Sequence, residues 1–550
     1  MRLIMVFNQT RRMLLAILVA ATSSASYSQE ISGTDILNLL VEQGVLTQDA
    51  AQKLIEKVRM RNEKAAQIEE QKVPPAGGEV RVPFVPGYVK KEIEHGVAAE
   101  VRGQVLEDIV AQARTERWNV PGSQPRWTDK IKITGDARLR AQADLYDSDN
   151  PAAPGADIYD LNTINDAGRR TGRDQYINVV DDQYRLRGRF RLMMQAKPTE
   201  GVEIGMRLTT GNQGVPGSAN QTLGNYGGKW DTNFDLAYIK YNDVAKSITL
   251  QGGKIKNPFL HTDLVWDDDL TFEGVAGIWN PLRSIDLEDD DRQWDPFVTL
   301  GAFPLQHVNV VRLPTDKQKS PGDKWLYAAQ FGTHYKWWSQ SELSVALSYY
   351  HYENITGTVN ELNSDLQNAT SAPYLQYGNA VYDISTTTDG TDELYGLASK
   401  YHLAGLTMVY DYAGFAPYHA IVTADYIKNI AFDSKEITDK TGDLPSDFPT
   451  RDVGYQFGVK VGWPNLNLRG NWDVSFVYRR LEGDAVVDAF ADSDFLLGGT
   501  NARGYIIKGD YALMDDVYAS LRWISAEELD TAVSNSVAVD RLFLDLGAKF

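Results

Sequence analysis

Polar and apolar residues alternate along much of the chain after residue 128, and the clearest case is YRLRGRFRLM, residues 184–193. Successive side chains of a β-strand point to opposite faces. The pattern therefore predicts a strand with a guanidinium face and an oily face, which fits either a soluble sandwich or a membrane barrel. The guanidinium face consists of Arg185, Arg187, Arg189 and Arg191.

The length of the alternation favours a membrane barrel. It continues through KIKITGDARLRAQADL, residues 130–145. A strand of a soluble protein has about 5–6 residues, whereas a strand that spans a membrane has about 9–11. The same pattern returns at residues 201–211, 341–352, 453–463, 471–481, 504–514 and 540–550.

Short connections alternate with long ones between these segments, as in outer-membrane barrels, where tight turns face the periplasm and long loops face outward. Short connections include residues 197–201, 242–246 and 413–417. We therefore predict an all-β transmembrane antiparallel β-barrel over residues 128–550, with about sixteen strands (fourteen to eighteen) and both ends periplasmic. One connection, residues 281–295, is longer than a turn should be. The expected long loops are residues 147–182, 212–230, 257–271, 304–323, 355–392, 430–452, 482–502 and 526–539.

The last segment ends on Phe550, and the leucines before it share its face. A closing strand with a terminal aromatic residue is the signal that barrel-assembly machinery recognises in outer-membrane proteins. We expect this machinery as a partner during insertion, and outer-membrane lipid around the mature barrel. The leucines of the signal are Leu542, Leu544 and Leu546.

The N-terminal part predicts secretion followed by a helical segment. Arg11 and Arg12 precede the apolar stretch MLLAILVAA and a run of small residues, which is typical of a signal peptide, residues 1–28. Residues 29–72 predict periplasmic helices, either as a coiled coil or as a lone amphipathic helix. Residues 73–127 hold a linker rich in proline and glycine and a further helix.

Composition narrows the range of partners. The net charge of −19 argues against nucleic acid, because phosphate contacts need a basic surface. The chain has no cysteine, which excludes disulfides and thiolate metal sites. No apolar run reaches the length of about 18 residues that an ordinary transmembrane helix needs, so none is expected in the mature chain.

The arginine face cannot point into lipid. An arginine that faces hydrocarbon in the middle of the membrane costs about 2–4 kcal/mol in a barrel. Four would cost about as much as the whole stability of a domain, about 5–15 kcal/mol. We therefore expect the arginines to line a wet lumen. Arg138 and Arg140 have the same parity on the preceding segment and Arg207 has it on the next, which predicts a basic wall across three strands.

The long connection NPFLHTDLVWDDDLTFE, residues 257–273, mixes carboxylates with large apolar residues. We expect it to fold into the lumen, anchored by its aromatic residues, so that its carboxylates face the basic wall and create a transverse field. The alternative is a solvated outer loop. The candidate constriction residues in this segment are Asp263, Asp267, Asp268, Asp269 and Glu273.

Four motifs carry a resemblance: EVRVPFVPGYVKKEI, VAQARTERW, KITGDARLR and KNPFLHTDLVWDDDLTFEGVA. They resemble the family described as putative porins of Gram-negative bacteria, over most of the mature chain. The resemblance implies a β-barrel in the outer membrane of a Gram-negative bacterium, with the N-terminal segment in the periplasm. The N-terminal helices are also similar to those of phosphate-selective porins, which implies a homotrimer.

These features predict an outer-membrane porin through which small hydrophilic solutes or ions diffuse passively. The alternatives are an anion- or phosphate-selective channel and a barrel that anchors the envelope. An enzyme is not expected, because none of the seven histidines lies in a nucleophile motif. No cofactor is expected, although the carboxylates of SIDLEDDDRQW, residues 284–294, are possible Ca²⁺ ligands that lack EF-hand spacing.

Overall fold

The computed structural model describes residues 130–550 with short internal gaps. The predicted signal peptide, periplasmic helices and linker lie outside the described residues, as does most of the candidate calcium segment, so these expectations stay predictions. No described helix is long and apolar enough to cross a membrane. The gaps are residues 152–157, 171–174, 212–213, 285–291, 310–317, 338–340, 389–390, 443–449 and 531–535.

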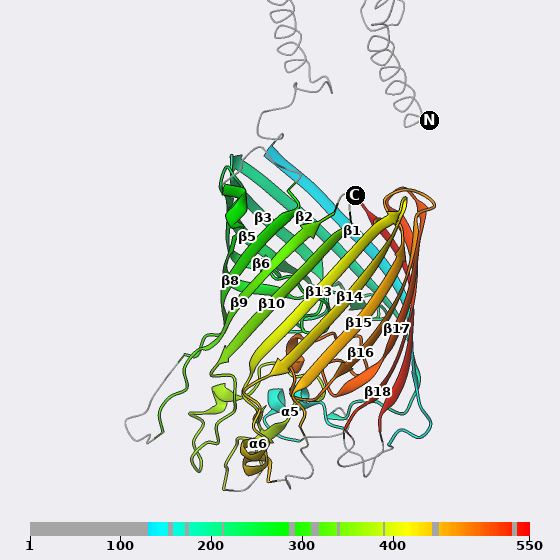
Figure 1. Ribbon diagram of the computed structural model, residues 1–550. Helices are drawn as coiled ribbons and strands as arrows, with labels where there is room; N and C mark the ends of the chain where they lie inside the picture. Colours follow the sequence, from blue (N-terminus) through cyan, green and yellow to red (C-terminus); the bar gives the residue numbers. More distant parts are fainter. Residues whose placement is uncertain are drawn as a thin grey trace, which may run out of the picture. The chain divides into compact units, whose positions relative to one another are not determined.

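Sixteen of the described strands form one closed antiparallel barrel, which confirms the predicted architecture (Figure 1). Each strand pairs with its neighbours along the chain, and the last pairs with the first. The strands are β1 (Ile131–Tyr146), β2 (Gln183–Thr199), β3 (Val202–Thr210), β5 (Thr232–Asn242), β6 (Ile248–Lys256), β7 (Thr271–Trp279), β8 (Trp294–Gln306), β9 (Lys324–Lys336), β10 (Glu342–Glu353), β13 (His402–Phe415), β14 (Tyr418–Asn429), β15 (Val453–Gly462), β16 (Trp472–Leu481), β17 (Ala502–Met514), β18 (Val517–Glu528) and β19 (Ala538–Lys549).

The remaining described elements belong to the connections. The short strand β4 pairs with β2 beyond the loop end of β3, and β11 and β12 form a separate two-stranded sheet within one long loop. In Figure 1 the tight turns lie at the top and the long loops at the bottom. These elements are β4 (Gln221–Thr222), β11 (Val381–Asp383), β12 (Tyr395–Leu397), α5 (Leu161–Ala167), α6 (Ser434–Thr441), η3 (Pro281–Ser284), η4 (Asn368–Thr370) and η5 (Asp488–Phe490).

The two faces of the wall separate by polarity. On β2, Leu186, Phe190 and Leu192 are exposed on the outer face, whereas Arg140 on the inner face of β1 is only 4% exposed. Two rings of outward aromatic side chains border the apolar belt, as in transmembrane barrels. The ring at the turn end consists of Tyr241, Trp279, Trp294, Tyr335, Phe415, Tyr418, Trp472, Tyr511 and Phe550, and the ring at the loop end of Tyr184, Phe234, Tyr327, Tyr349, Tyr426, Tyr455 and Tyr505.

The barrel closes where β19 pairs with β1. Beyond this ladder, the backbone of Phe550 makes two hydrogen bonds with Gly135, N–H to O at 3.0 Å and O to N–H at 2.9 Å. A Cβ atom at position 135 would lie 2.4 Å from the ring of Phe550, so only glycine leaves room for that ring. Leu542, Leu544 and Leu546 lie exposed on the outer face of the same strand.

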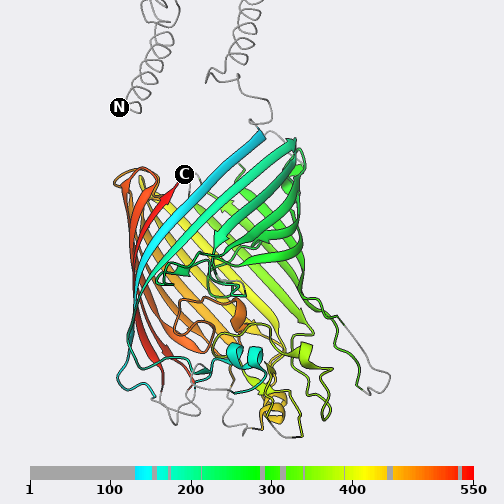
Figure 2. The same cartoon turned by 180° about the vertical axis from the view of Figure 1, so that it is seen from behind.

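The wall is low on one side. β3, β6 and β7 have 9 residues each, whereas β1 and β2 have 16 and 17. Pairing of β5 with β6 begins only at Ala237 and Lys254, so the first residues of β5 pair with β3 alone. In Figure 2 the inner loops are visible beyond the ends of these short strands.

A charge placed on the apolar belt should destabilise the barrel. Leu347 lies in the middle of β10 on the outer face and is 59% exposed. We expect Leu347→Arg to lower the free energy of unfolding by about 2–4 kcal/mol. The measurement is urea unfolding in lipid vesicles, followed by the mobility shift between folded and unfolded forms on a gel. Leu347→Ile is the matched control, and equal stability of the two variants would contradict an outer, lipid-facing position.

Candidate functional site

The predicted arginine face lies on the inner side of three adjacent strands. Arg138 of β1 is directly opposite Arg189 of β2, and Arg140 is opposite Arg187. Like charges that face each other across a strand pair destabilise a sheet. The wall therefore needs carboxylates among its guanidinium groups, and the next contacts show where they come from.

Aspartates of β1 and of the flanking strands β5 and β19 neutralise most of this face. Arg140 donates from Nε and Nη2 to both carboxylate oxygens of Asp545, at 2.7 and 2.9 Å. Arg191 donates from Nε to Asp136 at 2.8 Å. Further ion pairs on the wall join Arg189 to Asp136, Arg207 to Asp235, and both Arg185 and Arg541 to the fully buried Asp144.

The acidic loop, residues 257–270, lies inside the barrel. Trp266 is 1% exposed, and its ring centroid lies 5.0 Å from that of Phe272 and 5.1 Å from that of Tyr350. Phe259 and Leu264 are buried in the same cluster. The aromatic residues thus hold the loop against the wall formed by β7, β8 and β10.

The carboxylates of this loop reach two groups of arginines. Asp269 accepts hydrogen bonds from Arg189 at 3.1 Å and from Arg191 at 3.2 Å. Asp263 forms an ion pair of 2.8 Å with Arg479 of β16, across the lumen from β2. The loop therefore spans the lumen between two basic sites.

A second loop, residues 482–501, enters the lumen and meets the first. The backbone N–H of Asp267 donates to the carbonyl oxygen of Phe490 at 2.9 Å, and the N–H of Ser493 donates to the carboxylate of Asp267 at 3.0 Å. Asp494 of this loop pairs with Arg140 at 3.2 Å and also with Arg522. Sequence reasoning placed these residues in an ordinary long loop.

One predicted constriction residue does not belong to the lumen. Glu273 lies in β7, which begins at Thr271, and it shares the outer face with Val275 and Trp279. Its carboxylate is 65% exposed and pairs with Lys254 at 2.8 Å. The expectation for Glu273 was wrong because the strand begins before this residue, so that Phe272 points inward and Glu273 points outward.

The two inner loops set the ionisation of their carboxylates. Burial and the nearby Asp492 raise the pKa of Asp267 to about 8, and burial and Asp263 raise the pKa of Asp268 to about 6. Burial also opposes ionisation of Asp494, but the surrounding arginines outweigh it and hold the pKa of Asp494 well below its usual value. At neutral pH the constriction therefore carries partly protonated carboxyl groups beside fully charged ones.

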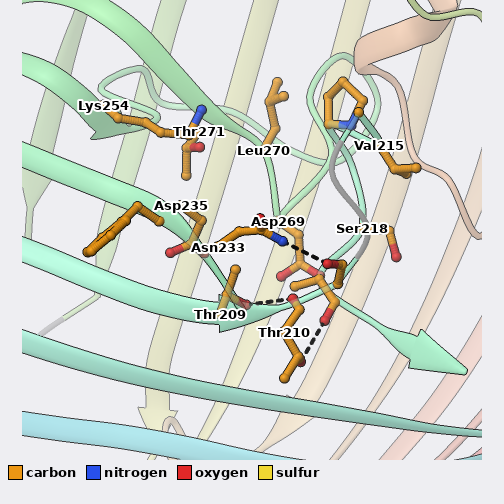
Figure 3. Close-up of a pocket in the computed structure, with 15 residues that line it drawn as sticks. Thr209, Thr210, Val215, Ser218, Asn233, Asp235, Lys254, Asp269, Leu270 and Thr271 are labelled. Carbon is orange, nitrogen blue, oxygen red and sulfur yellow. Dashed lines mark hydrogen bonds between the residues drawn. The ribbon is translucent and has the colours of Figure 1, made fainter. Parts of the chain in front are cut away.

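Next to the first loop is a cavity of about 340 Å³, bounded by β3, β5 and the loop itself (Figure 3). Thr209, Asn233, Asp235 and Asp269 contribute polar groups to its lining. The amide of Asn233 donates to the carbonyl oxygen of Gly211 at 2.8 Å. Water and small solutes therefore have polar space between the acidic loop and this part of the wall.

The family model described as "Putative porin" matches residues 31–550. The chain belongs to this family. The family and the barrel together support an outer-membrane porin channel rather than an enzyme. Within the described residues, no group of three or more histidine, aspartate or glutamate side chains is placed to hold a metal ion.

Three solved structures are similar to this porin at low sequence identity. OprB of Pseudomonas putida, in its high-pH structure, has a TM-score of 0.43 and 12% identity, covering 79% of this chain and 97% of its own. The channel DcaP of Acinetobacter baumannii has a TM-score of 0.38 and 11% identity, covering 76% and 97%. OmpF of Salmonella typhi, in a complex with daunomycin, has a TM-score of 0.38 and 8% identity, covering 77% and 99%. No curated protein matches the sequence.

The raised pKa values predict that ion selectivity of this porin depends on pH. The pKa of Asp268 is about 6 and that of Asp267 is about 8. Raising the pH from about 5 to about 9 therefore ionises both groups and adds negative charge at the constriction. We expect the reversal potential in a salt gradient to move toward cations over this range. The movement should be lost in Asp267→Asn combined with Asp268→Asn, and kept in the exposed-loop control Asp323→Asn. An unchanged pH dependence in the double variant would contradict the assignment.

Proposed function

We propose that this porin lets small hydrophilic solutes and ions diffuse passively through a water-filled lumen, past a constriction formed by the two inner loops. The observation that carries the proposal is the contact between loops 257–270 and 482–501, which places carboxylates opposite the arginines of β1 and β2. Opposed charges in a narrow aqueous space create a field across it. Such a field favours hydrated, charged or dipolar solutes over apolar ones.

Because most arginines of the wall are paired with carboxylates, the field across the lumen extends over a smaller region than it would if these arginines were unpaired. Most guanidinium groups of the wall already contact a carboxylate. Arg138 is 3.9 Å from Asp545, and Arg187 donates to the amide oxygen of Gln142 but pairs with no carboxylate among the described residues. On the other side, Asp268 and Asp267 are the less strongly paired carboxyl groups, and their negative charge grows as the pH rises past their pKa values of about 6 and about 8. The net field therefore acts between these few groups, which suits a channel of modest selectivity.

The orientation in the envelope follows from the seam and the turns. The tight turns and the closing residue Phe550 lie at one end of the barrel, and the long loops lie at the other. In outer-membrane barrels the turns face the periplasm. We infer that the N-terminal segment continues into the periplasm and that the assembly machinery recognises the strand that ends at Phe550.

The first loop should restrict the open channel because Trp266 anchors it. Trp→Ala substitutions in a packed cluster cost about 3–5 kcal/mol, and Trp266 is the largest of the buried apolar side chains that hold this loop. We expect Trp266→Ala to free the loop, raise the single-channel conductance in planar bilayers and increase the noise of the open state. Trp279→Ala, on the outer face of β7, should leave the conductance unchanged. An identical conductance of folded Trp266→Ala and the parent would refute the constriction.

We also infer that copies associate through the low wall into a homotrimer. The first residues of β5 pair on one side only, and backbone polar groups at membrane depth need a protein partner. The charged pair of Lys254 and Glu273 faces outward on the same side.

A single introduced cysteine can test this interface, because the chain has none of its own. Val275→Cys lies on the low wall, and Leu347→Cys lies in the middle of β10, away from it. With a trifunctional maleimide in native membranes, which can join one cysteine from each of three subunits, we expect cross-linked species up to the trimer for Val275→Cys. Cross-linking of Leu347→Cys alone would place the interface elsewhere.

A further inference from the structure

A second cavity lies on the loop side of the constriction, between the arginine wall and four connections. Its volume is about 310 Å³. Arg185, Arg187 and Arg541 line the wall side, and Leu161 and Tyr374 are among the residues that line the other side. It is the part of the described lumen where the arginine face meets an apolar surface.

The arginines around this cavity are incompletely neutralised. Arg185 and Arg541 share the single carboxylate of Asp144, which also accepts from the amide of Gln142. Arg187 forms no ion pair with any described residue, and its Nη1 donates a hydrogen bond to the amide oxygen of Gln142 at 3.2 Å. The Nε atoms of Arg185 and Arg187 are buried without a partner in the described structure. Arg185 and Arg541 therefore share one carboxylate, and Arg187 has no ion pair among the described residues.

The other two carboxylates at the cavity are already engaged. Asp494 pairs with Arg140 and Arg522. Asp160 caps helix α5, where it accepts from the backbone N–H of Asn162 and of Thr163. Neither makes a direct hydrogen bond to Arg187 within the described residues, so positive charge remains available to a solute.

The apolar side of the cavity is fixed in place. The side-chain amide of Asn162 donates to the carbonyl oxygen of Leu375 at 2.6 Å and accepts from its backbone N–H at 2.7 Å. Gln376 is held by the carboxylate of Asp488 and by two carbonyl oxygens of the second inner loop. These bonds hold Tyr374 and Leu375 beside the arginines as a preformed surface.

We propose that this cavity binds a small organic carboxylate, whose charged group is held by Arg185 and Arg187 and whose carbon body contacts Tyr374 and Leu161. A guanidinium group offers a planar fork of donors that matches a carboxylate, and the apolar side accepts the rest of the molecule. The inference rests on the proposed diffusion function and adds the class of solute. Binding in a channel has to be weak enough for the solute to leave. The solute competes with Gln142 for the donors of Arg187, and this competition weakens its binding.

The test is block of the chloride current by benzoate in planar bilayers. We expect benzoate to lower the single-channel conductance saturably and benzyl alcohol, its neutral counterpart, to have no effect. Because hydrogen bonds to a charged group are lost, Arg187→Gln should raise the half-blocking benzoate concentration about tenfold or more. Arg187→Lys keeps the positive charge but loses the planar pair of guanidinium donors, so its half-blocking concentration should be intermediate. This variant replaces Arg187→Gln in the test if Arg187→Gln fails to insert.

Two further arms separate the parts of the proposal. Tyr374→Ala should weaken block by benzoate but not block by inorganic phosphate, which has no carbon body. Lys460→Gln removes a lumen cation of β15, away from the cavity, and should leave benzoate block unchanged. The absence of saturable block, or equal block in the parent and in both Arg187 variants, would overturn the site. Equal effects of Tyr374→Ala on benzoate and phosphate would overturn the organic class. A parent protein without any ion conductance would instead refute the diffusion function itself.

Discussion

The pairing of wall arginines with carboxylates is the interaction on which the rest of the lumen depends. β1 and β2 bring Arg138 next to Arg189 and Arg140 next to Arg187, an arrangement that repels itself without counter-charges. Strand aspartates satisfy part of this demand, and Asp269 and Asp494 supply more from the two inner loops. The loops are therefore held inside by the same charges that make the wall polar.

Periodicity and connection length made most of the barrel predictable. The strands could be located because polar and apolar residues alternate over more residues than a strand of a soluble protein has. Their number followed from the alternation of short turns with long loops. The connection between β7 and β8 was correctly recognised as unusually long, and it contains η3. These features depend on local sequence, because a strand that separates lipid from water must repeat its pattern at every second residue.

The lumen was less predictable, because its contacts join residues that are far apart in the chain. Asp545 accepts a hydrogen bond from Arg140 across the seam, and the local sequence around either residue does not predict this pair. The inward path of residues 482–501 had a usable signal, because GDAVVDAFADSDF mixes carboxylates with apolar residues as the first loop does. The error at Glu273 came from a shift of a few residues in where β7 begins, which is enough to exchange inside and outside.

The seam at Gly135 and Phe550 bears on how the molecule forms. The first strand of the barrel, β1, and the last, β19, are separated in the sequence by all the other strands, yet they pair with each other. Contacts between residues so far apart in the sequence slow folding, because the chain loses the entropy of closing a long loop before these contacts can stabilise it. Closure thus waits for the final residues, and until then both terminal strands present open edges that need a chaperone or a template.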